Sequence, residues 1–444
     1  MDLIRERPLL NSQRLAVALL ASLSAAFVLG AVGSAASTRP VSFAQAKVYA
    51  TDEGPAGVAL GDLNGDGHPD LASANYTANT VSVLLNNGDG TFRTRHDYST
   101  APSPKALVLG DLNGDGKADL VTANLWDDTI SVLLANGDGT LQAKRDYRTA
   151  ERPFDVALGD LDGDGRLDIA VAADESNMIS VFRNSGDGSF EASRNYETDA
   201  GPDSIAIADM NADGRPDLIT ANGAAATVSV LVNGGDGNFT AGSVFDLGSN
   251  GFPSLAVGDL NGDTAPDLAV MDSGEGLSVL LSRQGGGFAP RRLYRRWYGG
   301  GVTIADLNGD GTRDLALAGG YMLNRGDGGF EAGVELPGGS GGTAGDVNGD
   351  GKVDLAAAYY SSDRGWIAVL INTPGLCNVQ YVLEKSLAAA RQTLARGHCR
   401  VGKLRRAHST WAKKGRVISQ KPGAGLVVPA GTKVNLVVSK GRRK

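Results

Sequence analysis

A short acidic string recurs seven times along the chain and constrains its fold more than any other feature. The first copy, Asp-Leu-Asn-Gly-Asp-Gly-His-Pro-Asp-Leu, begins at Asp62, and the later copies begin at Asp111, Asp160, Asp209, Asp259, Asp306 and Asp346. Successive copies are 49, 49, 49, 50, 47 and 40 residues apart. A period of this size indicates supersecondary units that bury a core only by stacking on their neighbours.

Within each period the apolar residues form short alternating runs, as they do in strands. In the first unit these runs span 58–60, 71–74, 81–85 and 92–98, and turns rich in Gly, Asn and Asp separate them. The unit has no helical period. Four short strands repeated seven times predict a mainly β fold, a seven-bladed β-propeller over residues 42–373.

The two ends of the array predict how the ring closes. The seventh unit ends with its third strand, over 366–370, and has no fourth one. An additional strand over 43–49 precedes the first unit and is similar to residues 92–98. We therefore expect this N-terminal strand to complete the last blade, because an open ring would expose unpaired strand edges.

The repeated string carries oxygen side chains at its first, third, fifth and ninth positions. In the first copy these are Asp62, Asn64, Asp66 and Asp70, and the Gly at position six permits a sharp bend. Ca²⁺ takes about six to eight oxygen ligands, which carboxylates, amides and a backbone carbonyl such as that of His68 can supply. Strings of Asp, Asn and Gly also form ordinary turns, but seven copies that keep all four oxygen side chains favour a metal site.

The units resemble the FG-GAP (VCBS-type) repeats of integrin-α-like propellers over about residues 42–373. In that family the loop between the first two strands of a blade holds Ca²⁺, so the resemblance implies up to seven structural calcium ions. The implied ligands are Asp62, Asn64, Asp66, Asp70, Asp111, Asn113, Asp115, Asp119, Asp160, Asp162, Asp164, Asp168, Asp209, Asn211, Asp213, Asp217, Asp259, Asn261, Asp263, Asp267, Asp306, Asn308, Asp310, Asp314, Asp346, Asn348, Asp350 and Asp354. Two loops depart from the pattern: Thr264 replaces the Gly at position six of the fifth loop, and Ala212 replaces the Gly at position four of the fourth.

Charge divides the chain into two parts. The formal net charge is −8, but residues 376–444 contain 16 of the 42 Lys and Arg residues and a single acid, Glu384. Helical spacing over 383–398 and alternating strands over 416–420 and 433–438 predict a small α+β module there.

The pattern of this module over residues 376–440 resembles a PASTA domain, on the motifs Cys399-Arg400-Val401-Gly402 and Gln420-Lys421-Pro422. The resemblance implies attachment to a bacterial cell wall, often to peptidoglycan. The positive charge suits such a polyanionic partner, with a merely solubilising surface as the alternative. Cys377 and Cys399 are expected to form a disulfide bond in an exported module, with two buried free thiols as the alternative.

The first 36 residues carry an export signal. Basic residues precede an uncharged apolar run over 15–32, and small residues follow at 34–36. This pattern predicts a cleaved signal peptide, or alternatively an N-terminal membrane anchor that is retained. In both cases the rest of the chain lies outside the cytoplasm, secreted or on the surface of a bacterium.

Aromatic and Arg residues suited to ligand binding fall mainly in the links that lie opposite the acidic loops. The candidates for a ligand face are Trp126, Arg295, Arg296, Trp297, Tyr298, Tyr359, Tyr360 and Trp366, with Tyr76 and Tyr321 beside them. Ordinary packing is the alternative for these residues. The tripeptide Arg325-Gly326-Asp327 matches the integrin-recognition sequence, but the repeat itself explains Gly326 and Asp327.

The sequence gives little support for catalysis, since it has no nucleophile–base pair and no cofactor fingerprint. It predicts a secreted or cell-surface, calcium-binding, non-enzymatic binding or adhesion protein whose propeller presents a face to a glycan or a protein. A secreted polysaccharide lyase or hydrolase that uses the same face is the alternative. We expect a monomer, and we expect no nucleic-acid partner because the protein is exported.

Overall fold

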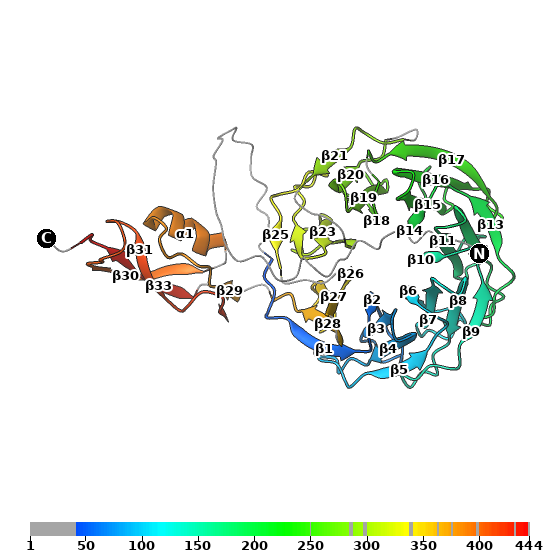
Figure 1. Cartoon of the computed structure of the whole chain (residues 1–444), viewed down its shortest axis with the longest axis horizontal. Coiled ribbons are helices and arrows are strands. Elements are labelled where there is room, and N and C mark those ends of the chain that lie inside the picture. The colour runs from blue at the N-terminus through cyan, green and yellow to red at the C-terminus, as the bar shows by residue number, and fades with distance from the viewer. Residues whose placement is uncertain are drawn as a thin grey trace, which may run out of the picture. The chain divides into compact units, whose positions relative to one another are not determined.

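The computed structural model describes residues 41–248, 250–283, 287–295, 300–336, 341–361, 364–373, 376–396, 399–429 and 432–442. Seven four-stranded antiparallel sheets surround a common axis as the blades of a propeller (Figure 1). The mainly β, seven-bladed fold predicted from the repeats is confirmed. The predicted signal segment, residues 1–36, lies outside the described residues.

In the first four blades the strands run from the axis outward in sequence order. They are β2 (Pro55–Gly61), β3 (Asp70–Asn75), β4 (Thr80–Leu84) and β5 (His96–Ser99); β6 (Pro104–Gly110), β7 (Asp119–Asn124), β8 (Thr129–Leu133) and β9 (Arg145–Arg148); β10 (Pro153–Gly159), β11 (Asp168–Ala173), β12 (Met178–Phe182) and β13 (Arg194–Glu197); and β14 (Pro202–Ala208), β15 (Asp217–Asn222), β16 (Thr227–Asn233) and β17 (Phe239–Asp246). The fourth strand of the first blade is shorter than the predicted run over 92–98, because Phe92 makes only an isolated bridge to Asn86.

The last three blades keep this order, except that the seventh takes its outer strand from the N-terminal part of the chain. The strands are β18 (Ser254–Gly258), β19 (Asp267–Asp272), β20 (Gly276–Leu280) and β21 (Arg292–Tyr294); β22 (Val302–Ala305), β23 (Asp314–Leu317), β24 (Gly320–Met322) and β25 (Val334–Glu335); and β26 (Gly341–Gly345), β27 (Asp354–Ser361), β28 (Arg364–Leu370) and β1 (Lys47–Thr51). In β1, Tyr49 lies opposite Ile367 of β28, so the predicted closure is confirmed.

The core of the ring lies between adjacent blades. One cluster joins Val121 and Ile130 of the second blade to Ile169, Val171 and Phe182 of the third, and each of these side chains is at most 1% exposed. Burying such apolar surface between sheets is the main favourable term in folding. A blade therefore depends on its neighbours for a core, as expected for a repeat array.

Aromatic pairs strengthen the outer part of several blade interfaces. The ring of Tyr49 in β1 meets Phe92 of the first blade edge-on at 5.3 Å, and Tyr196 meets Phe239 of the next blade in the same way. Edge-to-face geometry places the positive ring edge on the negative ring face, which favours such pairs. The contact between Tyr49 and Phe92 also joins the last blade to the first one.

The C-terminal module is a small α+β unit with its own core. Its elements are β29 (Leu376–Asn378), α1 (Leu387–Arg396), β30 (Arg400–Ala407), β31 (Val417–Lys421), β32 (Val427–Pro429) and β33 (Lys433–Ser439). Val382, Leu394, Val417 and Val434 are fully buried in it. The predicted helix and two strands are confirmed, with the helix beginning at Leu387, whereas the charged strand β30 was not predicted.

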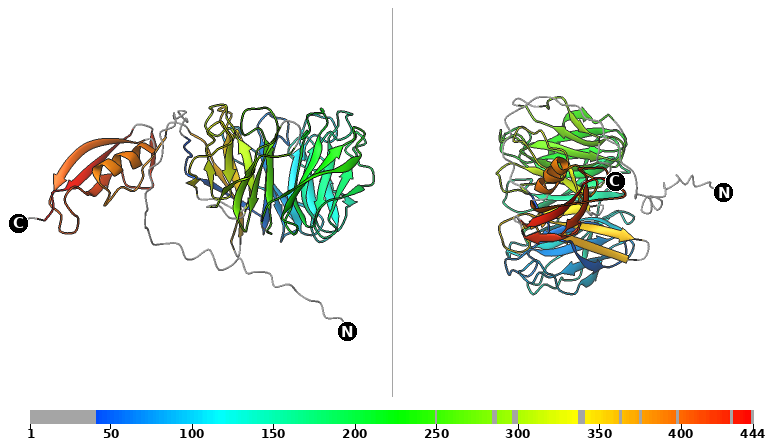
Figure 2. Two further views of the ribbon diagram at one scale, coloured as in Figure 1. Left: turned by 90° about the horizontal axis from the view of Figure 1, so that it is seen from above. Right: turned by 90° about the vertical axis from the view of Figure 1, so that its left-hand side faces the viewer.

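Figure 2 shows the propeller edge-on, with its strands running through the thickness of the ring. In the part of the chain that the structure describes, no helix is both long enough and apolar enough to cross a membrane.

Candidate metal-binding loops

Each acidic loop joins the innermost strand of a blade to its second strand, so the seven loops lie on one face of the ring. The Asp at position one organises the loop. In the first blade, Asp62 Oδ1 accepts hydrogen bonds from the amides of Gly65 (2.7 Å) and Asp66 (3.1 Å), and Oδ2 accepts one from Gly67 (2.7 Å). The same three contacts recur at Asp111, Asp160, Asp306 and Asp346.

The side chains at positions three and five lie at the tip of the loop. Asn64 Oδ1 accepts a hydrogen bond from the amide of Asp66 (2.8 Å), and Asp66 Oδ1 accepts one from the amide of His68 (2.9 Å). Each of these oxygens has a second lone pair that the backbone does not use. The loop is therefore folded by its own acidic side chains, which keep free electron pairs for a cation.

The Asp at position nine has a structural role that the sequence did not reveal. Asp70 is fully buried, and its two oxygens accept hydrogen bonds from the amides of Leu63 (3.0 Å) and Asn86 (2.7 Å). Asn86 opens the hairpin turn after the third strand, so the carboxylate joins two loops of one blade. The equivalent residues, all with 0% exposure, are Asp119, Asp168, Asp217, Asp267, Asp314 and Asp354.

Burial raises the pKa of these position-nine carboxyls. It raises the pKa of Asp70 to about 6, although the amides of Asn86 and Leu63 lower it. The nearby charges of Asp66 and Asp62 contribute to this increase. Burial likewise raises the pKa of Asp314 to about 7. A cation in the loop would offset the repulsion between the buried carboxylate and the acids at positions one and five.

An Asn at the start of the hairpin turn joins neighbouring blades, and sequence reasoning missed it. Asn86 Nδ2 donates to the carbonyl of Pro69 in its own blade (2.9 Å) and to that of Val347 in the seventh blade (2.8 Å). Its equivalents, which reach the preceding blade in the same way, are Asn184, Asn233, Asn324 and Asn372. The second and fifth blades have Ala135 and Ser282 there. The recurrence of Asn before the turn Gly was the available signal.

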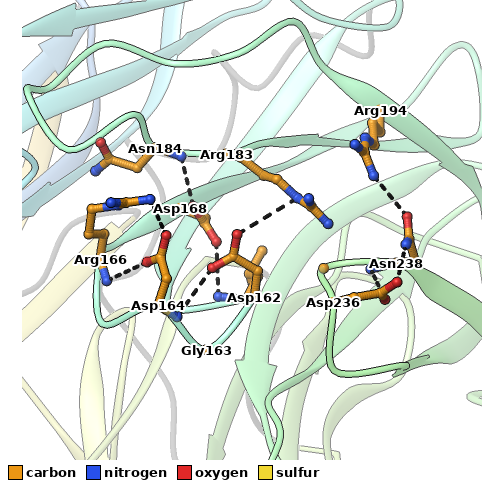
Figure 3. A network of polar contacts seen from close by, with 12 residues as sticks. Asp162, Gly163, Asp164, Arg166, Asp168, Arg183, Asn184, Arg194, Asp236 and Asn238 are labelled. Carbon is orange, nitrogen blue, oxygen red and sulfur yellow. Dashed lines mark hydrogen bonds and ion pairs between the residues drawn. The ribbon is translucent and has the colours of Figure 1, made fainter.

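The third loop contains a fourth acid and brings its carboxylates together. One oxygen each of Asp160, Asp162 and Asp168 lie within 4.8 Å of one another. Asp162 also lies 3.9 Å from Nε of Arg183, as Figure 3 shows. The other six blades have Asn in place of Asp162 and an aliphatic residue in place of Arg183. The additional acid and an additional base thus occur in the same blade.

Lys and Arg at position seven partly balance the charge of four loops. The side chain of Lys117 lies 3.5 Å from Asp115, and that of Arg215 lies 2.6 Å from Asp213. Arg166 pairs with Asp164 and Lys352 with Asp350 in the same way. These exposed pairs are individually weak. They nevertheless reduce the repulsion among the acidic side chains of these loops.

The two loops that depart from the pattern keep its main contacts. Thr264 has a φ of 71° and Ala212 a φ of 60°, in the left-handed region that Gly adopts freely. The amide of Thr264 still donates to Asp259 Oδ2 at 2.9 Å. The fifth loop therefore has the common shape, but its backbone is strained because a β-branched residue is unfavourable at this φ.

The donor set of the loops fits Ca²⁺. It consists of carboxylate and amide oxygens on a tight loop, and backbone carbonyls are available beside them. It includes no Cys or His that would favour a softer metal, apart from His68 at position seven of the first loop. The residues that would hold the ion are those at positions one, three, five and nine.

The predicted ligand face is only partly within the described residues. Trp126 is 60% and Tyr359 is 43% exposed, and the rings of Tyr359 and Trp366 stack with their centroids 6.2 Å apart. Arg295 is exposed and lies 3.9 Å from Glu275. The inclusion of Tyr321 was wrong, because this side chain is buried between blades and only 6% exposed. Arg296, Trp297, Tyr298 and the side chain of Tyr360 lie outside the described residues.

The tripeptide Arg325-Gly326-Asp327 has the geometry of the other hairpin turns. The amide of Gly326 donates to Asn324 Oδ1 at 2.9 Å, as the amide of Gly88 does to Asn86 Oδ1 in the first blade. Asp327 Oδ1 accepts a hydrogen bond from the amide of Gly329. The repeat frame therefore accounts for Gly326 and Asp327.

The predicted disulfide bond stays a prediction. Cys399 is buried in the core of the C-terminal module at 4% exposure. The side chain of Cys377, in β29, lies outside the described residues.

Fold and loops together define a class: a seven-bladed β-propeller whose blades each contain an acidic loop that could hold a cation. The chain matches the FG-GAP-like repeat in five overlapping windows, residues 62–122, 111–171, 160–220, 209–270 and 259–317. These windows span more than half of the chain, which therefore belongs to the FG-GAP-like repeat family. Each window begins at the first Asp of a loop and extends past the next loop. Residues 379–440 match the PASTA domain.

Solved structures are similar to this chain at low sequence identity. BBS1N, in complex with ARL6DN, has 14% identity and a TM-score of 0.55, over 76% of this chain and 98% of that one. An Agrocybe aegerita lectin that recognises non-reducing terminal N-acetylglucosamine has 21% identity and a TM-score of 0.47, over 64% and 80% of the two chains. Virginiamycin B lyase from Staphylococcus aureus has 14% identity and a TM-score of 0.47, over 74% and 100%. At 14% identity the likeness to BBS1N concerns the fold alone.

Proposed function

We propose that this protein is a calcium-stabilised, non-enzymatic binding protein on the outside of a bacterial cell. FG-GAP-like repeats and a PASTA domain fit a surface or cell-wall-associated protein. In this proposal the propeller is a rigid platform that presents one face to a glycan or a protein, and the PASTA domain attaches it to the wall. The observation that carries the calcium role is the convergence of carboxylate oxygens in the third loop, within 4.8 Å of one another.

Calcium would act here as a structural ion. The position-one Asp already fixes the shape of each loop through backbone amides, so an ion would enter a preformed site. A ligand that binds only the folded state stabilises it by about 2.7 kcal/mol per site at a concentration of 100 Kd. Several occupied loops would therefore raise the unfolding temperature of the ring considerably.

Metal analysis and thermal unfolding with and without a chelator test the calcium role. We expect several Ca²⁺ per chain, and a Tm about 10 °C or more lower after chelation. Asp164→Ala should remove one ion per chain. Asp187→Ala is the matched control, since this exposed Asp lies in the hairpin turn of the same blade and accepts from Ser189. No bound metal together with an unchanged Tm would refute the proposal.

The C-terminal module supports attachment to the cell wall through its charge. PASTA domains generally bind peptidoglycan or related wall ligands. The strand β30 exposes Arg400, Lys403, Arg405 and Arg406 on this module. A positive surface attracts polyanions, and salt screens that attraction.

A sedimentation assay with isolated cell walls tests this attachment. The full chain should bind, and binding should weaken as the salt concentration rises. Replacing both Arg405 and Arg406 by Gln should weaken it further, whereas Asp164→Ala should leave it unchanged. Wall binding that is unaffected by both salt and these substitutions would contradict an electrostatic attachment through β30.

Thiol titration of the unfolded protein tests the predicted disulfide bond. It should detect no free Cys if the bond is present.

A further inference from the structure

The face opposite the acidic loops contains a distinctive position at the start of the innermost strand in the first four blades. In the first four blades the register shifts there by one residue, between Pro55 and Gly57 and at the equivalent places. The additional residues at these β-bulges are Ala56, Lys105, Phe154 and Asp203. Bulges commonly redirect side chains next to functional sites. Because the backbone frame is shared and the side chains differ, the fold of the blade does not determine these residues.

The residue before the Pro at each of these strands has a left-handed backbone. The φ of Gly54 is 73° and that of Gly201 is 72°, whereas Ser103 of the second blade and Arg152 of the third are non-Gly residues with a φ of 60°. Gly adopts this conformation without strain because it has no Cβ, whereas Arg is strained in it. Backbone strain of this kind is found at functional sites, and the contacts of the Arg152 side chain indicate what its role would be.

The Arg152 side chain holds an exposed Trp in place. Its guanidinium carbon lies 5.1 Å from the ring centroid of Trp126, which favours a cation–π contact. The indole Nε1 of Trp126 donates a hydrogen bond to Tyr76 Oη of the first blade at 2.5 Å. Arg152 is itself anchored by Glu175 at 2.7 Å and Asp174 at 3.4 Å. Contacts from both sides thus fix the orientation of a ring that remains 60% exposed.

A second exposed ring lies nearby on the same face. Phe252, at the entry to the fifth blade, is 66% exposed and stacks on Phe154 with a centroid distance of 6.3 Å and an interplanar angle of 9°. Lys105 Nζ lies 4.9 Å from the centroid of Phe154. Nζ has no hydrogen-bond or ion-pair partner among the described residues, so the ammonium group is available as a donor. Lys105 therefore lies beside Phe154, the ring on which the exposed Phe252 stacks.

The charges of this surface favour a neutral ligand. Arg152 is paired with two acids, and Asp155 and Asp203 lie close enough to act on the charge of Lys105. The cluster therefore has no excess of positive charge that would select phosphate or sulfate. What it offers is two oriented aromatic faces with a free ammonium donor and the carboxylate of Glu175, which is 58% exposed.

We infer that Trp126 and Phe252 form two stacking platforms for the pyranose rings of a neutral oligosaccharide, with Lys105 and Glu175 hydrogen-bonding its hydroxyls. The C–H face of a pyranose is weakly positive and packs on the negative face of an aromatic ring. Hydroxyl groups both donate and accept, so they suit a carboxylate and an ammonium group equally. This inference rests on the proposed function, because it names a ligand class and a place for the binding platform.

A glycan array of neutral and uronic-acid pyranose oligosaccharides tests the inference, using the full chain with calcium. The wild type should bind neutral oligosaccharides. Trp126→Ala and Phe252→Ala should each weaken this binding about tenfold or more. Both side chains are exposed, so neither substitution should lower Tm. Trp411→Ala is the matched control, since Trp411 is 58% exposed but belongs to the C-terminal module, and it should leave binding unchanged.

Arg152→Gly tests the positioning role separately. It should weaken glycan binding without lowering Tm, because Gly relieves the strained φ while the support of Trp126 is lost. Lower Tm with unchanged binding would mean that Arg152 is merely structural.

Three array results would overturn the inference: no neutral glycan bound, binding of uronic-acid glycans alone, or binding that survives both aromatic substitutions. None of them affects the calcium or cell-wall experiments, so failure here is distinguishable from failure of the proposed function.

Discussion

The two faces of the propeller differ in how far their contacts recur from blade to blade. On the loop face, the same hydrogen bonds recur from blade to blade, and the position-nine Asp is fully buried in all seven. On the opposite face, equivalent bulge positions hold Ala56, Lys105, Phe154 and Asp203. Contacts that recur in the blades hold the ring together, whereas the side chains of the opposite face differ from blade to blade and are where we propose that a ligand binds.

The largest expected effect concerns the loop face itself. Asp168→Ala leaves two buried backbone amides, those of Leu161 and Asn184, without acceptors. Without calcium, the free energy of unfolding should fall by about 3–5 kcal/mol. Asp164→Ala in the same loop removes an exposed carboxylate and should change it by less than about 1 kcal/mol. Urea denaturation in chelator measures both, and equal effects would show that position nine is no different from position five.

The next effect concerns the contact between blades. Asn184→Ala removes the amide that donates to the carbonyls of Leu112 and Leu167. We expect a loss of about 2 kcal/mol in urea denaturation, because these acceptors lie in a buried interface. The reciprocal change, Ala135→Asn, supplies the amide where the second blade lacks it and should add about 1 kcal/mol. If the reciprocal variant is destabilised, Ala135 belongs to a different packing arrangement.

A smaller effect concerns backbone strain in the fifth loop. Thr264→Gly should raise stability by about 1 kcal/mol, since it removes a β-branched residue at a φ of 71°. Gly311→Thr at the same position of the sixth loop should lower stability by a similar amount. A Cβ at Gly311 would have no atom within 4 Å, so the loss would come from the backbone alone. Opposite shifts in Tm check the pair, and two shifts of the same sign would contradict the strain argument.

A further expected effect is a pH dependence on the opposite face. Burial and the nearby charge of Asp174 raise the pKa of Asp203 to about 8, although the amide of Gly223 and the charges of Lys105 and Arg152 lower it. The folded state therefore binds a proton more tightly than the unfolded chain. The stability contribution of Asp203 is fully present below about pH 4, falls as pH rises towards about 8, and is constant above that.

Asp203→Asn, which cannot ionise, is the direct comparison. Between pH 6 and 9 the Tm of the wild type should fall more steeply than that of the variant. Identical profiles would mean that Asp203 ionises normally and that its burial has no energetic consequence.

Most of the fold and the outline of the loops were predictable from the sequence. A period of 40–50 residues, alternating strands and an additional N-terminal strand led to a closed seven-bladed ring. The four oxygen positions of each loop were visible because they are local, spaced within nine residues of one another. Two contacts could not be predicted: the hydrogen bond by which Asp70 joins two loops of one blade, and the bond from the Asn86 side-chain amide to the neighbouring blade. Their partners are determined by how strands and blades pack.

The sequence by itself determined the architecture, since strand periodicity and turn chemistry act over short stretches of chain and a repeat forces neighbours to stack. Only the tertiary structure decided which side chains meet across blades. Asn86 reaches Val347 only in the closed ring, and Arg152 reaches Trp126 only because two blades place them on one face. The repeat pattern does not indicate that these residues are in contact, because packing between the blades brings them together.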